Sequence, residues 1–253
     1  MPAAPFVWYE LMTKDLDGAL AFYGEVLGWK AADAGMPGMR YVLLKVGETP
    51  VGGSMDLNTP GCPEGASTGW TGYVGVDDVD AYAERAGKAG GAVHMAPQDI
   101  PNVGRFAMVA DPQGAVFALF KGSSEAPPAI DETVQGAPCW RELHSSDAVS
   151  GWDFYRELFG WREKQAMDMG PMGVYRIFGG GGEDMTGGMF TDPEAARPYW
   201  LYYFNVDDID AAAERVTAAG GQVTYGPAEV PGGYIVNALD PQGGAFGLSG
   251  PRK

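Results

Sequence analysis

The stretch FVWYELMTKDLDGALAFYGEVLGW, residues 6–29, contains the pattern that decides the fold. It opens with an apolar strand, reaches Asp15 as a helix cap, and continues with apolar residues at helical spacing. Gly28 follows where a helix can end in the left-handed conformation. The segments after it are rich in β-branched and aromatic residues, which predicts further strands. This stretch and its continuation therefore predict a β-α-β-β-β module.

The same pattern returns later in the chain. Trp8 and the Glu-Leu pair after it are repeated 132 residues later from Trp140, and Phe22-Tyr23 returns as Phe154-Tyr155. A second copy of the strand and helix rhythm lies inside each half. The four predicted modules cover about 6–56, 70–121, 138–190 and 199–249.

The chain thus divides into two similar halves. We expect one domain over residues 1–122, another over 138–253, and a linker over 123–137, which is rich in proline and polar residues. The sequence does not decide whether the modules pair within each half or across the linker.

Charge and composition exclude several classes of function. The chain has 17 basic and 33 acidic residues and a net charge of −16, so it should repel nucleic acid and anionic membranes. It contains no run of 18 apolar residues, and its first residues lack the pattern of a secretory signal. We therefore expect a cytoplasmic protein without a nucleic-acid or membrane partner, either a monomer of two domains or a homodimer.

Three repeated motifs carry a resemblance to a known family. They are FYGEVLGW with FYRELFGW, VDDVDA with VDDIDA, and DPQG, which begins at Asp111 and again at Asp240. Together they resemble the vicinal oxygen chelate superfamily, which includes glyoxalase I, bleomycin-resistance proteins and extradiol dioxygenases. The chain looks most like a two-domain, actinobacterial-type, glyoxalase-like branch. The resemblance implies an α+β fold, a tandem duplication of paired βαβββ modules in which each pair forms a cup-shaped, strand-rich domain.

The resemblance also implies where a metal would be bound. Metal enzymes of the superfamily place His, Gln or Glu at four positions inside the cup. Three of these positions correspond here to Trp8 and Trp140, Thr71 and Leu201, and Ala118 and Gly247. The fourth falls near Ser54 or Met55 in the first half and near Met189 in the second. Because these residues provide no set of three ligands, we expect no catalytic metal and no cofactor.

Alternation along the strands predicts which side chains face the cup. If the old ligand position faces inward, so do Trp8, Glu10 and Met12, and likewise Trp140, Glu142 and His144. The same parity adds Thr71, Tyr73, Leu201, Tyr203 and Asn205 as ligand-binding candidates. Tyr41 and Tyr175 correspond between the halves in the third-strand region. For each of these additional candidates, core packing is the more common role, because aromatic residues dominate ordinary packing.

The repeated Trp-x-Glu allows two interpretations. An indole can stack on a flat ligand, and the carboxylate beside it can accept a hydrogen bond or act as a general base, which makes Glu10 and Glu142 the catalytic candidates. Alternatively, the indoles fill the space that a metal has vacated, and each glutamate pairs with a backbone or arginine donor as a structural tie.

These observations favour two functions. The first is a metal-independent protein that binds a hydrophobic or aromatic small molecule, as in antibiotic or metabolite sequestration. The second is a metal-independent isomerase, cyclase or lyase that uses Glu10 or Glu142 as the base. Metal-dependent glyoxalase or dioxygenase chemistry is disfavoured by the missing ligands. The sequence leaves open whether one cup or both are functional.

Overall fold

The computed structural model of the chain describes residues 3–59, 62, 66–124, 130–170 and 173–253. Its elements follow the order strand, helix, strand, strand, strand four times, as the sequence predicts. The first module contains β1 (Phe6–Thr13), α1 (Leu16–Leu27), β2 (Lys30–Asp33), β3 (Tyr41–Val46) and β4 (Thr49–Asp56). The second contains β5 (Gly69–Gly75), α2 (Val79–Lys88), β6 (Ala92–Ile100), β7 (Gly104–Ala110) and β8 (Val116–Gly122).

The second half has the same arrangement of elements. The third module contains β9 (Pro138–Ser145), α3 (Ala148–Phe159), β10 (Arg162–Asp168), β11 (Val174–Gly179) and β12 (Gly187–Thr191). The fourth contains β13 (Tyr199–Asn205), α4 (Ile209–Ala218), β14 (Gln222–Val230), β15 (Gly233–Leu239) and β16 (Ala245–Gly250).

Each helix begins at an aspartate that accepts hydrogen bonds from the first turn. The Asp15 side chain accepts from the Gly18 N–H, and α1 ends at Gly28 in the left-handed conformation with φ 74°, as predicted. The caps of the other three helices are Asp78, Asp147 and Asp208. No helix within the described ranges has the length and apolar character that crossing a membrane requires.

The strands form two eight-stranded sheets, and each sheet joins two consecutive modules. The first sheet has the order β2-β3-β4-β1-β5-β8-β7-β6, and the second has the order β10-β11-β12-β9-β13-β16-β15-β14. The opening strands of two modules are therefore neighbours at the centre of each sheet. Two such sheets with short helices confirm the predicted α+β class and its tandem duplication.

The compact units of the chain group the modules differently from the two sheets. Unit 1 consists of Met1–Val7, Thr71–Pro128 and Trp140–Leu201, and unit 2 consists of Trp8–Trp70, Ala129–Cys139 and Tyr202–Lys253. Unit 1 thus combines most of the second and third modules, and unit 2 combines most of the first and fourth. Hydrogen-bonded sheets link modules within a half, whereas compact packing links modules across the linker. The division into domains 1–122 and 138–253 stays a prediction.

Repeated aromatic residues form the core of unit 2. Trp70 donates its indole N–H to the Tyr23 hydroxyl over 2.9 Å, and this hydroxyl donates to Asp240 over 3.0 Å. Trp29 stacks on Tyr23 with 5.6 Å between the ring centroids. Because Asp240 opens the DPQG turn, Tyr23 connects α1 of the first module to the fourth module.

Unit 1 contains the matching arrangement. Trp200 donates to the Tyr155 hydroxyl over 3.0 Å, and that hydroxyl donates to Asp111 over 3.0 Å. Trp161 stacks on Tyr155 with 5.5 Å between the ring centroids. The repeated Phe-Tyr, Gly-Trp and DPQG signals are thus explained by packing and lie outside the candidate site.

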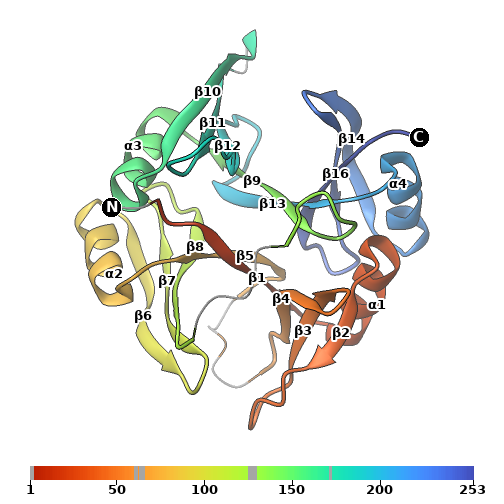
Figure 1. Cartoon of the computed structure of the whole chain (residues 1–253), viewed down its shortest axis with the longest axis horizontal. Coiled ribbons are helices and arrows are strands. Elements are labelled where there is room, and N and C mark those ends of the chain that lie inside the picture. Colours follow the sequence, from red (N-terminus) through yellow and green to blue (C-terminus); the bar gives the residue numbers. More distant parts are fainter. Residues whose placement is uncertain (1–2, 60–61, 63–65, 125–129, 171–172) are drawn as a thin grey trace. The chain divides into compact units, whose positions relative to one another are not determined.

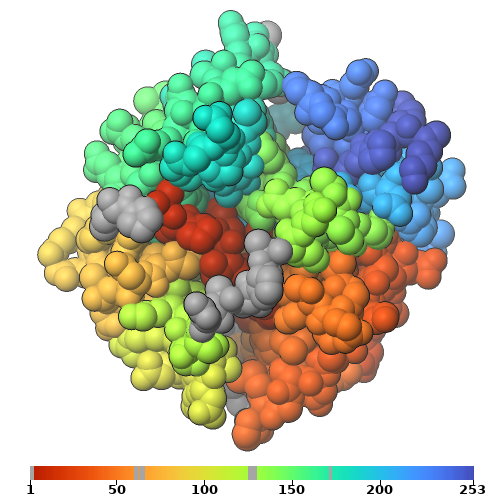
Figure 2. Space-filling model, in the orientation of Figure 1, coloured from red at the N-terminus to blue at the C-terminus, as the bar shows by residue number. Residues whose placement is uncertain are grey.

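The helices of each unit pack in pairs. Figure 1 shows α1 beside α4 in unit 2 and α2 beside α3 in unit 1. In the space-filling view of Figure 2, the blue atoms of α4 lie against the orange-red atoms of α1. Arg215 of α4 donates to the Val26 carbonyl at the end of α1, and Arg85 of α2 donates to the Glu157 carbonyl of α3.

Candidate functional site

The predicted ligand residues of the first strand share one face of β1. Tyr9 and Leu11 are buried, whereas Trp8, Glu10 and Met12, which alternate with them, are half-buried. This alternation agrees with the period of two that a strand imposes. The side chains of Trp8, Glu10 and Met12 therefore lie along a partly accessible surface.

The equivalent residues of β9 are more enclosed. Trp140 is half-buried, but only 8% of Glu142 and 5% of His144 is exposed. The two copies of the motif thus differ in how far their carboxylates are withdrawn from solvent.

In unit 2, Trp8, Glu10 and Tyr41 form a hydrogen-bonded group that we call the Glu10 cluster. The Trp8 indole N–H donates to the Tyr41 hydroxyl over 2.9 Å. That hydroxyl donates to the Glu10 carboxylate, also over 2.9 Å. Tyr41 comes from β3, two strands away from β1 in the sheet, so its ring extends across β4 to reach Glu10.

In unit 1, the same trio recurs with two additional residues, and we call it the Glu142 cluster. The Trp140 indole donates to the Tyr175 hydroxyl over 2.9 Å, and this hydroxyl donates to Glu142 over 2.6 Å. The other Glu142 oxygen lies 3.1 Å from His144 Nε2, and His144 Nδ1 lies 2.8 Å from the Asp192 carboxylate. One imidazole thus bridges two carboxylates.

Glycines on the adjacent strands make room for the two tyrosines. Gly53 of β4 pairs with Glu10, and Gly188 of β12 pairs with Glu142. A Cβ atom at Gly53 would overlap the Tyr41 hydroxyl, and one at Gly188 would overlap the Tyr175 hydroxyl. The absence of a side chain at these two positions therefore lets each ring lie across the neighbouring strand and reach the glutamate.

The two carboxylates next to His144 favour its charged form. A neutral imidazole has one N–H donor, so both ring nitrogens can donate to carboxylates only in the imidazolium. Burial alone would lower the pKa of His144, but the hydrogen bonds and charges of Glu142 and Asp192 outweigh it and raise the pKa. Asp192 changes in the complementary direction: burial would raise its pKa, but hydrogen bonds from His144 and the Glu194 N–H lower it.

The tyrosines of both clusters remain protonated donors. Burial, followed by the charge of Glu10, raises the pKa of Tyr41 well above its ordinary value. Burial and the charge of Glu142 raise the pKa of Tyr175 in the same way. Each hydroxyl therefore keeps its proton for the glutamate.

Aromatic rings enclose the imidazole of the Glu142 cluster. Tyr199 stacks on His144 with 4.4 Å between centroids and 15° between planes, and Phe190 meets it at 4.8 Å and 65°. Burial, followed by the charges of Asp192 and Glu142, raises the pKa of Tyr199 to about 12. These rings help to keep the imidazole away from solvent.

The two clusters differ chemically at two positions. Where the second copy has His144, the first has Met12. Asp192 lies four residues after Gly188, and the residue four after Gly53 is Leu57. The imidazole and its second carboxylate are therefore features of the second copy.

The remaining candidates from the sequence do not join these clusters in the described contacts. Thr71 and Tyr73 are buried in unit 1, where Tyr73 packs against Phe120 at 6.1 Å between centroids. Leu201 is buried in the same unit. Their roles in ligand binding stay predictions.

The last two candidates have structural hydrogen bonds in unit 2. Tyr203 is buried and donates to the Asn237 side chain over 2.9 Å. Asn205 donates to the Thr133 carbonyl over 2.7 Å and borders a surface hollow of about 410 Å³ at the end of β13. A ligand-binding role for Tyr203 and Asn205 also stays a prediction.

The superfamily's metal positions hold residues that do not fit a metal. The indole N–H of Trp8 and that of Trp140 are donors, already used by the tyrosines, and offer no lone pair. The Tyr203 ring lies over Gly247, in the space that a longer side chain would need. Within the described part of the chain, no three or more His, Cys, Asp or Glu residues are arranged to hold a metal ion. The Glu142 cluster is no exception, because both His144 nitrogens are engaged by carboxylates.

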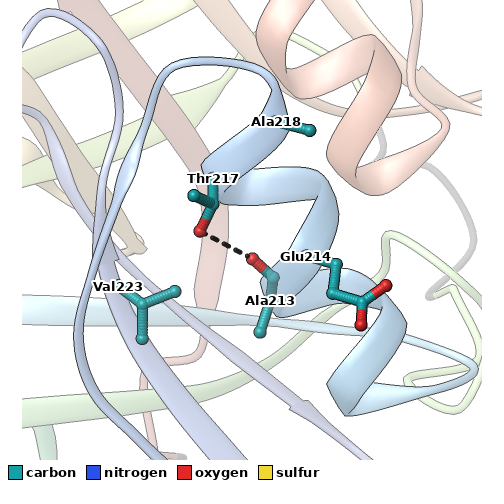
Figure 3. A pocket seen from close by; sticks show the side chains of 5 residues that line it. All are labelled: Ala213, Glu214, Thr217, Ala218 and Val223. Carbon is teal, nitrogen blue, oxygen red and sulfur yellow. Dashed lines mark hydrogen bonds between the residues drawn. The ribbon is translucent and has the colours of Figure 1, made fainter.

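A hollow on the surface of α4 does not involve either cluster. It has a volume of about 500 Å³ and is lined by Ala213, Glu214, Thr217, Ala218 and Val223. Figure 3 shows these side chains, with the Thr217 hydroxyl donating to the Ala213 carbonyl of its own helix. This surface has no convergent group of polar side chains that would orient a ligand.

Sequence reasoning missed three members of the clusters. The sequence favours core packing over ligand contact for Tyr41 and Tyr175, and it gives no signal for Asp192. The signal for the tyrosines was the glycine pair in GGSM and GGMF, where Gly53 and Gly188 flank the glutamates. No local pattern marks Asp192, because its relation to His144 depends on the pairing of β9 with β12.

The chain matches the family model described as "Glyoxalase/Bleomycin resistance protein/Dioxygenase superfamily" over residues 6–119 and 143–247. It is 32% identical to the provisionally named glyoxylase CFP32 of Mycobacterium tuberculosis, over 96% of this chain and 94% of that protein. It is also 32% identical to the anthracycline biosynthesis protein DnrV of Streptomyces peucetius, over 98% of this chain and 93% of that protein.

Solved structures share the fold at low identity. The Mn(II)-bound glyoxalase from Novosphingobium aromaticivorans matches with a TM-score of 0.66 and 16% identity, over 100% of this chain and 84% of that one. The 2,3-dioxygenase LapB from Pseudomonas sp. KL28 matches with a TM-score of 0.68 and 14% identity, over 100% and 94%. With its four βαβββ modules and a family match over both halves, the chain belongs to the glyoxalase/bleomycin resistance protein/dioxygenase superfamily.

Proposed function

We propose that the chain binds a planar hydrophobic or aromatic small molecule, without a metal, at the Trp-Tyr-Glu clusters. One observation carries this proposal: the hydrogen-bonded trio of indole, phenol and carboxylate is built twice, and the indole of each trio stands where the resemblance implies a metal ligand. A packing residue needs only volume, whereas this trio also orients two rings around one acceptor.

The hydrogen bonds determine how a ligand would meet the indoles. Because the N–H of Trp8 and the N–H of Trp140 already donate to tyrosines, contact with a ligand falls to the ring faces. Both indoles are half-buried, so part of each remains accessible. Stacking on a flat apolar molecule uses such a surface well. The relative named for anthracycline biosynthesis agrees with this class, since anthracyclines are polycyclic aromatic compounds.

Fluorescence quenching by the neutral probe naphthylmethanol tests the proposal. We expect Trp8→Phe and Trp140→Phe each to remove a separate part of the quenching and to weaken binding at that cluster roughly ten- to a hundredfold. Trp152→Phe is the matched control, because Trp152 lies on α3 and belongs to neither cluster. Undiminished quenching in the double variant Trp8→Phe/Trp140→Phe would mean that the pocket lies elsewhere.

A second candidate function is proton transfer by Glu142. The observation that favours it is the contact of Glu142 with His144, which is itself in contact with Asp192, since a carboxylate that is only a structural tie needs no such chain of titratable groups. The test begins with a ligand identified by native mass spectrometry on protein from its own host. Incubating that ligand in D₂O with the wild type should introduce solvent deuterium, and Glu142→Gln should abolish the exchange. Equal deuterium exchange with the wild type and with Glu142→Gln would mean that Glu142 has a structural role and transfers no proton.

A further inference from the structure

We infer that the release of a proton from His144 weakens ligand binding at the Glu142 cluster, whereas binding at the Glu10 cluster does not follow this proton. The inference rests on the proposed function, since it concerns the regulation of the stacking site on Trp140. Two features of unit 1 carry it: a continuous chain of hydrogen bonds from the imidazole to the indole, and the way in which neighbouring rings fix the imidazole.

Consecutive hydrogen bonds connect the imidazole of His144 to the indole of Trp140. The indole N–H donates to the Tyr175 hydroxyl over 2.9 Å, and this hydroxyl donates to one oxygen of Glu142 over 2.6 Å. The other oxygen of Glu142 lies 3.1 Å from His144 Nε2, and His144 Nδ1 lies 2.8 Å from Asp192. A change at Nε2 therefore reaches the half-buried indole through two intermediate side chains.

The imidazole ring has little room to turn away from its two partners. Tyr199 stacks on it with 4.4 Å between the ring centroids, and Phe190 meets it at 4.8 Å with 65° between the planes. Only 5% of His144 is exposed, so solvent gives little compensation for a lost partner. Both ring nitrogens therefore continue to face the carboxylates when the proton leaves.

Loss of the proton changes one of the two carboxylate contacts from attraction to repulsion. The imidazolium donates from both nitrogens, but a neutral imidazole has one N–H and presents a lone pair at the other nitrogen. The contact of Nδ1 with Asp192 is the shorter of the two, so we expect the remaining proton to stay on Nδ1. Nε2 then opposes Glu142 with a lone pair, which displaces this carboxylate and disturbs the Tyr175 hydroxyl that it accepts from.

The other titratable groups around the imidazole keep one protonation state while it titrates. Burial, followed by the charges of Asp192 and Glu142, raises the pKa of Tyr199 to about 12. Tyr175, the other partner of Glu142, also has a raised pKa because of its burial and the charge of Glu142. Burial lowers the pKa of His144, but its two carboxylate partners raise it overall, so the proton is released above the ordinary value of 6.5.

The first copy contains the same trio without the titrating group. Met12 stands where the second copy has His144, and a thioether does not titrate. Burial, followed by the charge of Glu10, raises the pKa of Tyr41 well above its ordinary value, so this donor keeps its proton. Burial, followed by the charges of Glu10 and Asp56, raises the pKa of the Cys62 thiol above 9.0. The Glu10 cluster therefore serves as an internal control for the histidine.

Naphthylmethanol tests the inference, because this probe is uncharged over the whole titration of a histidine. Calorimetric titrations at a series of pH values would use Trp8→Phe to isolate the Trp140 site and Trp140→Phe to isolate the Trp8 site. In Trp8→Phe we expect binding to weaken about tenfold as the pH rises, with a midpoint that equals the pKa of His144 from NMR. In Trp140→Phe we expect a change within about twofold over the same range.

Three further substitutions, each made in Trp8→Phe, identify the group that titrates. Asp192→Asn should move the midpoint to lower pH, because the imidazolium loses one of its two stabilising charges. His144→Met, which gives the second copy the residue of the first, should remove the pH dependence. His94→Gln is the matched control, because His94 is exposed on β6, and it should leave the profile unchanged. The comparison of the binding midpoint with the NMR pKa tests the inference even if His144→Met does not fold.

The outcomes separate the inference from the proposed function. If naphthylmethanol binds at Trp140 with an affinity that stays constant while His144 titrates, the inference is wrong and the stacking site stands. An equal weakening at Trp8 with the same midpoint would also overturn the inference, since the effect would then come from the charge of the whole chain. If probe binding responds to neither Trp8→Phe nor Trp140→Phe, both the inference and the proposed function fail.

Discussion

Glu142 and His144 show how neighbours on one strand determine the charge of a site. The two residues are two positions apart on β9, so both side chains project from the same face, and Asp192 completes the bridge from the end of β12. The sequence could predict the shared face of Glu142 and His144 from strand parity. It could not predict Asp192, because that contact depends on how two strands pair.

The first prediction concerns the titration of His144. NMR should give a pKa above 6.5 in the wild type, and Asp192→Asn should lower it, because one of the two carboxylates that stabilise the imidazolium loses its charge. The chain has two histidines, so the variant His94→Gln contains His144 as its one histidine and its NMR signal can be assigned directly. A His144 pKa at or below 6.5 that does not change in Asp192→Asn would contradict the interaction of a charged His144 with Glu142 and Asp192.

The direction of the shift also sets a pH dependence. When the pKa of a histidine rises on folding, the histidine stabilises the folded state fully at pH values below its unfolded-state pKa of about 6.5. This contribution is lost as the pH rises through the folded-state pKa. Urea unfolding of the wild type should thus show stability falling across that window, and Asp192→Asn should flatten the fall.

The second prediction concerns the glycines beside the glutamates. Gly53→Ala and Gly188→Ala should each destabilise the protein by about 1 to 3 kcal/mol, because the new methyl group displaces a tyrosine ring. Probe binding at the same cluster should fall as well. Gly24→Ala is the control: its Cβ atom meets the Trp29 carbonyl at an ordinary 3.5 Å, and alanine favours the helix. Normal binding in Gly53→Ala would show that the Tyr41 position is unimportant.

At the scale of elements, local signals predicted the helices and strands closely. Asp15 and Gly28 mark both ends of α1 because a cap and a left-handed residue act within one turn. Sequence spacing could not show that Tyr23 at the middle of α1 reaches Asp240, more than two hundred residues later. Contacts of this kind depend on the packing between modules, for which the sequence has no local pattern.

The third prediction concerns these ties between elements. Tyr23→Phe and Tyr155→Phe should each lower the free energy of unfolding by about 1 to 3 kcal/mol, because a buried aspartate loses a donor. Urea denaturation measures the loss, and Tyr225→Phe on an exposed strand is the control. An unchanged free energy of unfolding in both Tyr23→Phe and Tyr155→Phe would mean that the hydrogen bond between the helix and the DPQG turn contributes little to stability.

At the scale of the whole molecule, each compact unit draws on both halves of the chain. The sequence predicted four modules and a linker, but left the pairing of the modules open, because all four have similar apolar faces and compatible lengths. The cores around Tyr23 and Tyr155 explain why packing crosses the linker.

The fourth prediction follows from this arrangement. Cleavage at a protease site inserted into the linker, between Ser124 and Ile130, should leave the two halves associated at micromolar concentration, since each unit's core contains residues from both. Size-exclusion chromatography of the cleaved protein tests this. Two separately folded halves of residues 1–122 and 138–253 would instead support independent domains.

The central claim is that a planar ligand stacks on the indoles of the two clusters, and a crystal structure with bound naphthylmethanol tests it most directly. The account predicts ring density in van der Waals contact, about 3.5 to 4 Å, with Trp8 or Trp140. A naphthyl ring bound only elsewhere, for example in the α4 hollow lined by Ala213 and Val223, would contradict it.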